Sequence, residues 1–148
     1  AGLFTRAIAT LLTPPSIIYA VDKHRGALEQ LPVTICGNLI EKLALDFTHT
    51  DRLPSGLDGI LMANALHFVP EKHRFLEAIV GHLRPVGKII VIEYDTDKGN
   101  PWVPHPISFN TLKALLSDLG LESIETLYRQ PSLLTNYMLY SAVATVTA

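Results

Sequence analysis

The chain has 148 residues, of which 48% are hydrophobic and 18% are charged, with 12 Lys and Arg against 14 Asp and Glu. This composition excludes disorder and low complexity, and a formal net charge of −2 gives no general attraction to nucleic-acid phosphates. Cys36 alone excludes an internal disulfide, and no apolar run of about 18 residues marks a membrane span. We therefore expect one folded domain over residues 1–148 in a reducing, cytoplasmic compartment, without a nucleic-acid or membrane partner.

The first third of the chain alternates helical and strand patterns. Residues 3–12 predict a helix that ends before Pro14, with an inward face at helical spacing formed by Leu3, Ala7, Ile8, Leu11 and Leu12. Residues 17–21 predict a strand that ends in Asp22, and residues 23–31 predict a second helix that buries Ala27, Leu28 and Leu31. A weaker strand is expected over 40–46.

The middle of the chain continues this alternation. Residues 58–63 predict an apolar strand, and Pro70 suits the first position of the next helix. That helix is expected to end at Pro85 and Gly87, with a buried stripe of Phe75, Leu76, Ile79, Val80 and Leu83. Residues 88–93 form a continuous apolar run, as in a parallel strand covered on both faces.

The last third predicts a long loop over 96–107 and then a helix that Ser108 caps and Gly120 closes. Residues 122–129 and 136–147 predict two strands joined by a short connection, and hence an antiparallel finish. The expected fold class is α/β, a mostly parallel sheet with helices on both faces and an antiparallel C-terminal strand.

Ligands of such sheets bind at the carboxyl ends of the strands, where this sequence places polar residues. These residues are Asp22, Asp46, Asn64, His67, Tyr94 and Asp95. A carboxylate directly after a strand can accept hydrogen bonds from both hydroxyls of a ribose, and Asp22 fits that use. Asp22 fits equally well as a cap of the following helix, and the two roles are compatible.

Four consecutive segments resemble the class I S-adenosylmethionine (SAM)-dependent methyltransferases. They are IIYAVDKHRGALEQL, LALDFTHTDRLP, GLDGILMANALHFVP and LRPVGKIIVIEYD, which look like the second to fifth strands of that family with their loops. The resemblance implies a Rossmann-like three-layer sandwich, SAM as cofactor, and methyl transfer to a small-molecule acceptor.

The resemblance also implies a role for each matching residue. Asp22 would bind the ribose hydroxyls, with Lys23 beside it, and Asp46 would accept from the adenine amino group while the Phe47 backbone N–H meets a ring nitrogen. Ala63 and Asn64 would border the methionine part of the cofactor. From the residues alone, Asp46 and Phe47 are better read as an ordinary strand-ending acid and a core aromatic, and the alternative for Asn64 is a turn residue that bonds to its own backbone.

The chain departs from the family at its start. Gly2 would be the last glycine of the family's glycine-rich loop, and the strand before that loop, which belongs between the second and fourth, is not seen. We therefore expect an N-terminally truncated domain, a fragment of a longer methyltransferase, with weakened cofactor binding.

A general base is needed only if the acceptor arrives protonated. His67 is the first candidate and His105 the second, although His67 could equally be a satisfied structural histidine. Trp102, in the long loop, could contact an apolar or aromatic acceptor or simply pack the loop onto the core. No metal-ligand spacing or nucleophile motif appears. The rival functions are a non-catalytic methyltransferase-like binding domain and a nicotinamide-dependent oxidoreductase.

Overall fold

The computed structural model describes residues 2–148 and divides the chain into two compact units. Unit 1 covers residues 1–53 and unit 2 covers residues 54–148. Each unit has its own sheet, and the α/β class is as predicted.

Unit 1 holds a three-stranded mixed sheet. Its elements are α1 (Leu3–Leu11), β1 (Ile17–Val21), α2 (Arg25–Glu29), β2 (Thr34–Ile35), β3 (Asn38–Leu43) and the 3-10 turn η1 (Thr50–Arg52). The sheet order is β1-β3-β2, with β1 parallel to β3 from the Ile17↔Leu39 pair onward. The short strand β2 is absent from the sequence prediction. It forms because Cys36 and Gly37 both adopt positive φ, which makes the tight turn that pairs β2 with β3.

A small apolar core and one buried amide hold unit 1 together. The core consists of Ala20, Leu28, Leu31 and Ile40. Asn38 has no exposed surface, and its side-chain amide donates to the carbonyl of Ala9 at 2.9 Å while its oxygen accepts from the Ser16 N–H at 3.0 Å. This one side chain therefore joins α1, the loop after it and β3.

The predicted inward face of α1 is wrong. Leu3 is 73% exposed and Leu11 82% exposed, Ala7 and Leu12 are also exposed, and Ile8 is half-buried. The buried residue of the helix is Ala9, whose carbonyl the Asn38 amide meets. The helix therefore buries the side of Ala9 and leaves Leu3 and Leu11 exposed.

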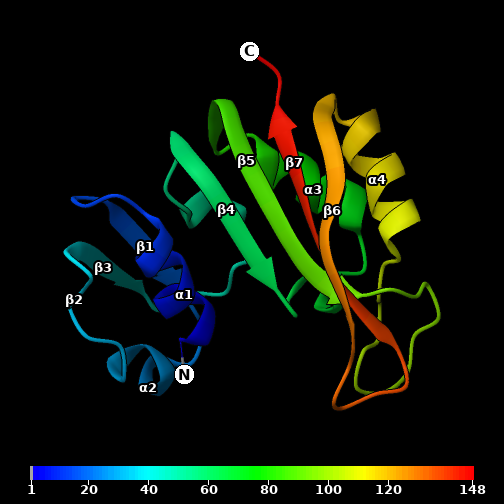
Figure 1. Ribbon diagram of the computed structural model, residues 1–148, viewed down its shortest axis with the longest axis horizontal. Coiled ribbons are helices and arrows are strands. Elements are labelled where there is room, and N and C mark those ends of the chain that lie inside the picture. The colour runs from blue at the N-terminus through cyan, green and yellow to red at the C-terminus, as the bar shows by residue number, and fades with distance from the viewer. Residues whose placement is uncertain (1) are drawn as a thin grey trace. The chain divides into compact units, whose positions relative to one another are not determined.

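Unit 2 holds a four-stranded mixed sheet. Its elements are β4 (Leu57–Ala63), the 3-10 turn η2 (Leu66–Phe68), α3 (Lys72–Val80), β5 (Leu83–Tyr94), α4 (Phe109–Asp118), β6 (Leu121–Pro131) and β7 (Met138–Val146). The strands lie in the order β4-β5-β7-β6 (Figure 1). The pair β4–β5 is parallel, whereas β5–β7 and β6–β7 are antiparallel, so the predicted antiparallel finish is confirmed.

The predicted end of the third helix is wrong. Pro70 lies two residues before α3 begins, and the helix stops at Val80 rather than continuing to Pro85. Residues 83–87 instead open a strand of 12 residues, β5, with a register shift against β4 and a positive φ at Val86. The irregular pairing there accommodates Pro85, which has no N–H to donate to a sheet.

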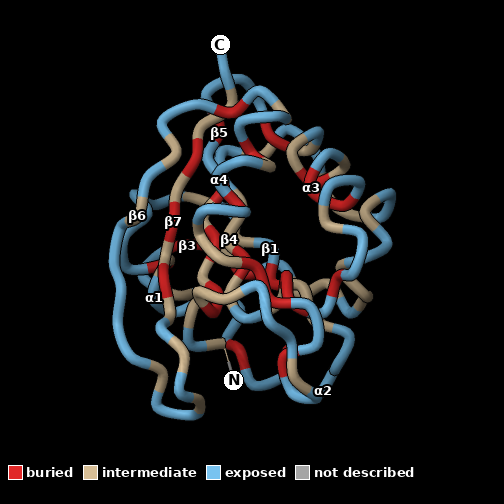
Figure 2. The backbone as a smooth tube through the Cα atoms, turned by 90° about the vertical axis from the view of Figure 1, so that its right-hand side faces the viewer, coloured by how far each residue is buried: buried red, intermediate tan, exposed pale blue. Residues whose placement is uncertain are grey.

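The strongest local prediction is confirmed at α4. The Ser108 hydroxyl accepts from the Thr111 N–H at 3.3 Å, Leu112 and Leu116 are buried, and Gly120 closes the helix with a φ of 81°. Buried stretches concentrate on β5 and β7, whereas β6 is largely exposed along its length (Figure 2). Among the described residues, no helix is both long and apolar enough to cross a membrane.

Candidate functional site

Unit 1 has a cavity of about 150 Å³ at the carboxyl end of β1. Its polar edge is formed by Asp22, Gly2 and Thr5, and the rest is apolar: Ala20, Val21, Ala27, Leu28 and Leu31. Two of the residues predicted to bind the cofactor, Gly2 and Asp22, therefore meet in one cavity.

Gly2 is held by its backbone conformation and by close packing. It is the N-cap of α1 with a φ of 72°, a left-handed conformation that favours glycine. A Cβ at this position would lie 2.2 Å from a methyl carbon of Leu31. No side chain among the described residues caps α1 here, so the N–H groups of its first turn are available to an acceptor at the cavity edge.

Asp22 is seen in one of the two roles that the sequence leaves open, the entry into α2. One carboxylate oxygen, Oδ1, accepts from the backbone N–H of His24 at 2.8 Å and so orders the turn into α2. Asp22 is only half-buried, which leaves its carboxylate open to further donors. Its helix-entry role is therefore seen, and a ribose contact remains compatible with it.

Asp46 lies after β3, the strand parallel and adjacent to β1. Its Oδ1 accepts from the Thr48 hydroxyl at 2.7 Å and the Thr48 N–H at 2.9 Å. These two bonds lower the pKa of Asp46, helped by the positive charge of Lys23. Lys23 and Asp46 therefore lie near one another at the same sheet edge as Asp22, and half-buried Phe47 follows directly.

In unit 2, Ala63 and Asn64 stand at the carboxyl end of β4. Ala63 pairs with Ile92 of β5, and the Asn64 N–H donates to the Ile92 carbonyl at 2.9 Å. Asn64 is exposed and has a φ of 50°, so it turns the chain sharply out of the strand.

His67 in η2 forms a buried pair with Glu93 of β5. The His67 ring Nδ1 lies 2.8 Å from Glu93 Oε2, and the His67 backbone N–H donates to Glu93 Oε1 at 3.2 Å. Glu93 has no exposed surface, and His67 is 4% exposed. A carboxylate can only accept, so Nδ1 carries the proton and Nε2 is left as the basic ring nitrogen.

Glu93 is a functional candidate that the sequence analysis missed. The signal was present, because an acid at the end of the apolar run KIIVIE is almost never buried without a partner. The sequence leaves His67 as either a general base or a satisfied structural histidine, and the structure buries it against Glu93.

The loop between β5 and α4 exposes Trp102 and His105. Trp102 is 85% exposed, so it does not pin the loop; buried Val103, Pro106 and Ile107 do. The His105 backbone N–H donates to the His67 carbonyl at 3.0 Å. The predicted second base and the Trp102 loop are therefore attached to the turn that carries His67.

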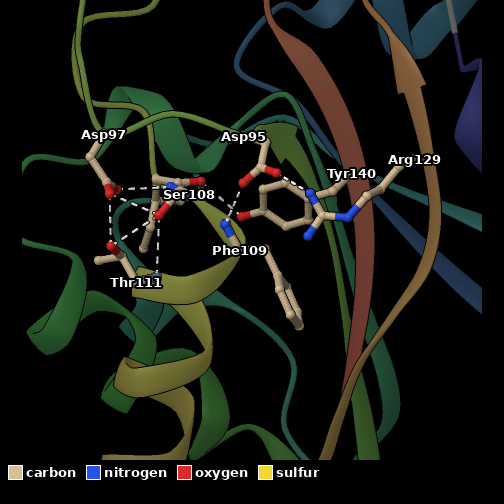
Figure 3. Close-up of polar contacts among 8 residues, drawn as sticks. Asp95, Asp97, Ser108, Phe109, Thr111, Arg129 and Tyr140 are labelled. Atoms are coloured by element: carbon tan, nitrogen blue, oxygen red, sulfur yellow. Dashed lines mark hydrogen bonds and ion pairs between the residues drawn. The ribbon is translucent and has the colours of Figure 1, made fainter.

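A polar network fixes the ends of this loop (Figure 3). Asp97 accepts from the Ser108 N–H and hydroxyl, each at 2.8 Å, and from the Thr111 hydroxyl at 2.9 Å. Asp95 accepts from the N–H of Phe109 at 2.9 Å and forms an ion pair with Arg129. The loop thus leaves β5 and enters α4 through fixed contacts.

Beside that network, the Tyr140 hydroxyl donates to the Ile107 carbonyl at 3.0 Å. Burial, more than the nearby acids, raises the pKa of Tyr140 far above its usual value. Tyr140 therefore stays a neutral donor. The described residues contain no cluster of His, Cys, Asp and Glu that could hold a metal ion.

Comparison with known proteins agrees with this arrangement. The family model for a methyltransferase domain matches residues 1–91. A SAM-dependent methyltransferase from Methanosarcina mazei is similar in structure with a TM-score of 0.71 and 14% identity, covering 99% of this chain and 88% of that one.

Two further solved structures share the fold. Burkholderia thailandensis 1,6-didemethyltoxoflavin N1-methyltransferase, with bound substrate and S-adenosylhomocysteine, has a TM-score of 0.70 and 18% identity over 99% of this chain and 78% of that one. Human N-acetylserotonin methyltransferase, in complex with SAM, has a TM-score of 0.53 and 22% identity over 74% of this chain and 34% of that one. No curated protein matches in sequence.

The fold is that of the class I SAM-dependent methyltransferases. The chain belongs to the methyltransferase-domain family.

Proposed function

We propose that this chain binds SAM and transfers its methyl group to a small-molecule acceptor, with His67 as general base. The observation that carries the proposal is the buried His67–Glu93 pair, at 2.8 Å, within a methyltransferase domain. The small-molecule acceptor is supported by the two structural neighbours named for small substrates.

The cavity of unit 1 fits the nucleoside of the cofactor. Its apolar floor suits an uncharged sugar and ring, and the half-buried carboxylate of Asp22 at its edge suits ribose hydroxyls. Asp46 would accept from the adenine amino group, with Lys23 and the Phe47 N–H beside it. Gly2 would bring the backbone of α1 close to the cofactor.

The residues of unit 2 would serve the methionine group and the acceptor. Ala63 and Asn64 would border the methionine part of the cofactor at the end of β4. When bound, SAM supplies a methyl group already activated by a sulfonium. The protein therefore needs chiefly to orient the acceptor and, if the acceptor is protonated, to remove its proton.

The geometry around His67 suits that proton transfer. Glu93 accepts from Nδ1–H, which fixes the orientation of the ring, and its carboxylate would stabilise the imidazolium that forms when Nε2 takes a proton. The ring of Phe68, 57% exposed, lies with its centroid 4.2 Å from that of His67 and offers an apolar contact beside the base. Trp102 and His105 would form the facing part of the acceptor site.

Two measurements test the proposal. Calorimetric titration with S-adenosylhomocysteine tests cofactor binding, and release of S-adenosylhomocysteine from SAM over a panel of hydroxylated and heteroaromatic acceptors tests transfer. His67→Ala should lower kcat about 10²–10⁴-fold and leave cofactor affinity unchanged. The matched control is His73→Ala, because His73 is exposed on α3 and its ion-pair partner, Asp118, is exposed as well.

Equal kcat in the His67→Ala and His73→Ala variants would refute the role of His67. Cofactor binding without turnover of any acceptor would favour the non-catalytic alternative.

A further inference from the structure

Lys72 occupies an unusual place in unit 2. It is the first residue of α3, where the helix dipole disfavours a positive charge, and yet its side chain folds inward and is half-buried. A lysine at a helix start normally extends into water. The position therefore needs a compensating interaction.

Two backbone carbonyls and two acidic side chains provide the interactions that compensate the Lys72 ammonium. Lys72 Nζ donates to the carbonyl of Val69 at 2.8 Å and to the carbonyl of His105. Burial lowers the pKa of Lys72, and the negative charges of Glu93 and Asp97 oppose that shift. The ammonium thus serves as counter-charge to the buried Glu93 carboxylate while it bonds to backbone on both sides.

The two carbonyls belong to the two segments that the proposed acceptor site requires. Val69 directly follows η2, the turn that carries His67, and His105 lies in the loop that exposes Trp102. The His105 N–H already donates to the His67 carbonyl, so Lys72 adds a second link at the same place. The rest of this loop is held by a turn in which Asn100 Oδ1 accepts from the N–H groups of Trp102 and Val103, by Asp97 at its end, and by its buried residues.

We propose that Lys72 is a positioning residue for methyl transfer, whose ammonium fixes the loop of Trp102 and His105 against the turn that carries His67. The inference rests on the proposed function, since that loop is taken as one wall of the acceptor site. Lys72 does not touch the reacting atoms. It sets the loop before the acceptor arrives and so reduces the ordering cost of binding.

Replacing Lys72 by Met retains the apolar stem and removes the ammonium. We expect the backbone amide of His105 to exchange at least about tenfold faster, because the loop loses its charge-assisted bond. Trp102 is the single tryptophan, so its fluorescence anisotropy decay reports the loop directly and should show a larger fast component. Lys72→Arg, which keeps the charge, should restore both signals in large part.

The matched control is Lys113→Met, which removes the ammonium of an exposed lysine on α4. With an acceptor that the unmodified protein turns over, Lys72→Met should raise the acceptor KM more than it lowers kcat. S-adenosylhomocysteine affinity should not change.

An unchanged exchange rate at His105 in Lys72→Met, with unchanged Trp102 anisotropy, overturns the inference whatever the activity. Equal loss in the Arg and Met variants also overturns it, because the charge would then not matter. Failure of the proposed function is distinct, since it shows as absent cofactor binding or as a His67 variant that turns over normally.

Discussion

Replacing Glu93 with Gln tests the buried pair at its centre. The carboxylate accepts from both the backbone N–H and the ring Nδ1 of His67. The two donors lie on different carboxylate oxygens, and a glutamine amide has oxygen at only one of these positions and NH₂ at the other, so in the same geometry it accepts only one of these bonds. The backbone N–H cannot change, and leaving it unpaired would cost about 1–3 kcal/mol, whereas the imidazole can change its tautomer without that cost.

We therefore expect the oxygen of the introduced amide to face the backbone and its NH₂ to face the ring. The ring of His67 then carries its proton on Nε2 and can no longer accept one there. The fold is retained, and kcat falls about 10²–10⁴-fold, which corresponds to about 3–5 kcal/mol of barrier.

Nitrogen-15 NMR of the imidazole distinguishes the two tautomers without any acceptor, and single-turnover methyl transfer gives the rate. The control is Glu122→Gln, which removes an exposed carboxylate on β6. A Glu93→Gln variant with unprotonated Nε2, or with a rate equal to that of the control, would show that the argument from the pair is wrong.

Two further predictions concern the other acids. Asp22→Ala should weaken S-adenosylhomocysteine binding by about 2–3 kcal/mol, and Asp22→Asn should weaken it by less. If Asp22→Ala lowers the melting temperature through loss of the bond to the His24 N–H but leaves the affinity unchanged, Asp22 serves only the entry into α2. Asp97→Asn should reduce the fall in melting temperature that occurs as the pH is lowered. Burial raises the pKa of Asp97, but the hydrogen bonds from Ser108 and Thr111 outweigh burial, so the pKa is lowered from its usual value. A carboxylate whose pKa is lower in the folded state than in the unfolded state stabilises the fold at pH values above its unfolded pKa. This contribution is lost as the pH falls through the folded pKa. The melting temperatures of the unmodified protein and the variant, measured between about pH 5 and pH 2, should therefore converge at the acid end.

The sequence was sufficient to predict structure where a residue interacts with backbone close to it in the chain. Ser108 caps α4 because its hydroxyl reaches an N–H three residues ahead, and the strand at 17–21 follows from a short β-branched run. The edge positions of Asp22 and Asp46 follow from the parallel pairing of their strands.

Tertiary contacts decided the rest. Helical spacing cannot show that Ala9, rather than Leu11, meets the buried amide of Asn38, because Asn38 comes 29 residues later. The burial of His67 depends in the same way on Glu93, which is 26 residues away. Periodicity describes one element at a time, whereas these contacts join two.

The small core of unit 1 has a consequence for how the protein is degraded. The apolar core of this unit has four buried side chains, and three of them, Ala20, Leu28 and Leu31, also line the cavity beside Asp22. A segment with so few buried apolar contacts opens more readily than the longer sheet of unit 2, so limited proteolysis should cut first within residues 2–53. Cofactor at a hundredfold excess over its Kd would add about 2.7 kcal/mol to this unit, so the supply of cofactor would set the lifetime of the protein in the presence of a protease.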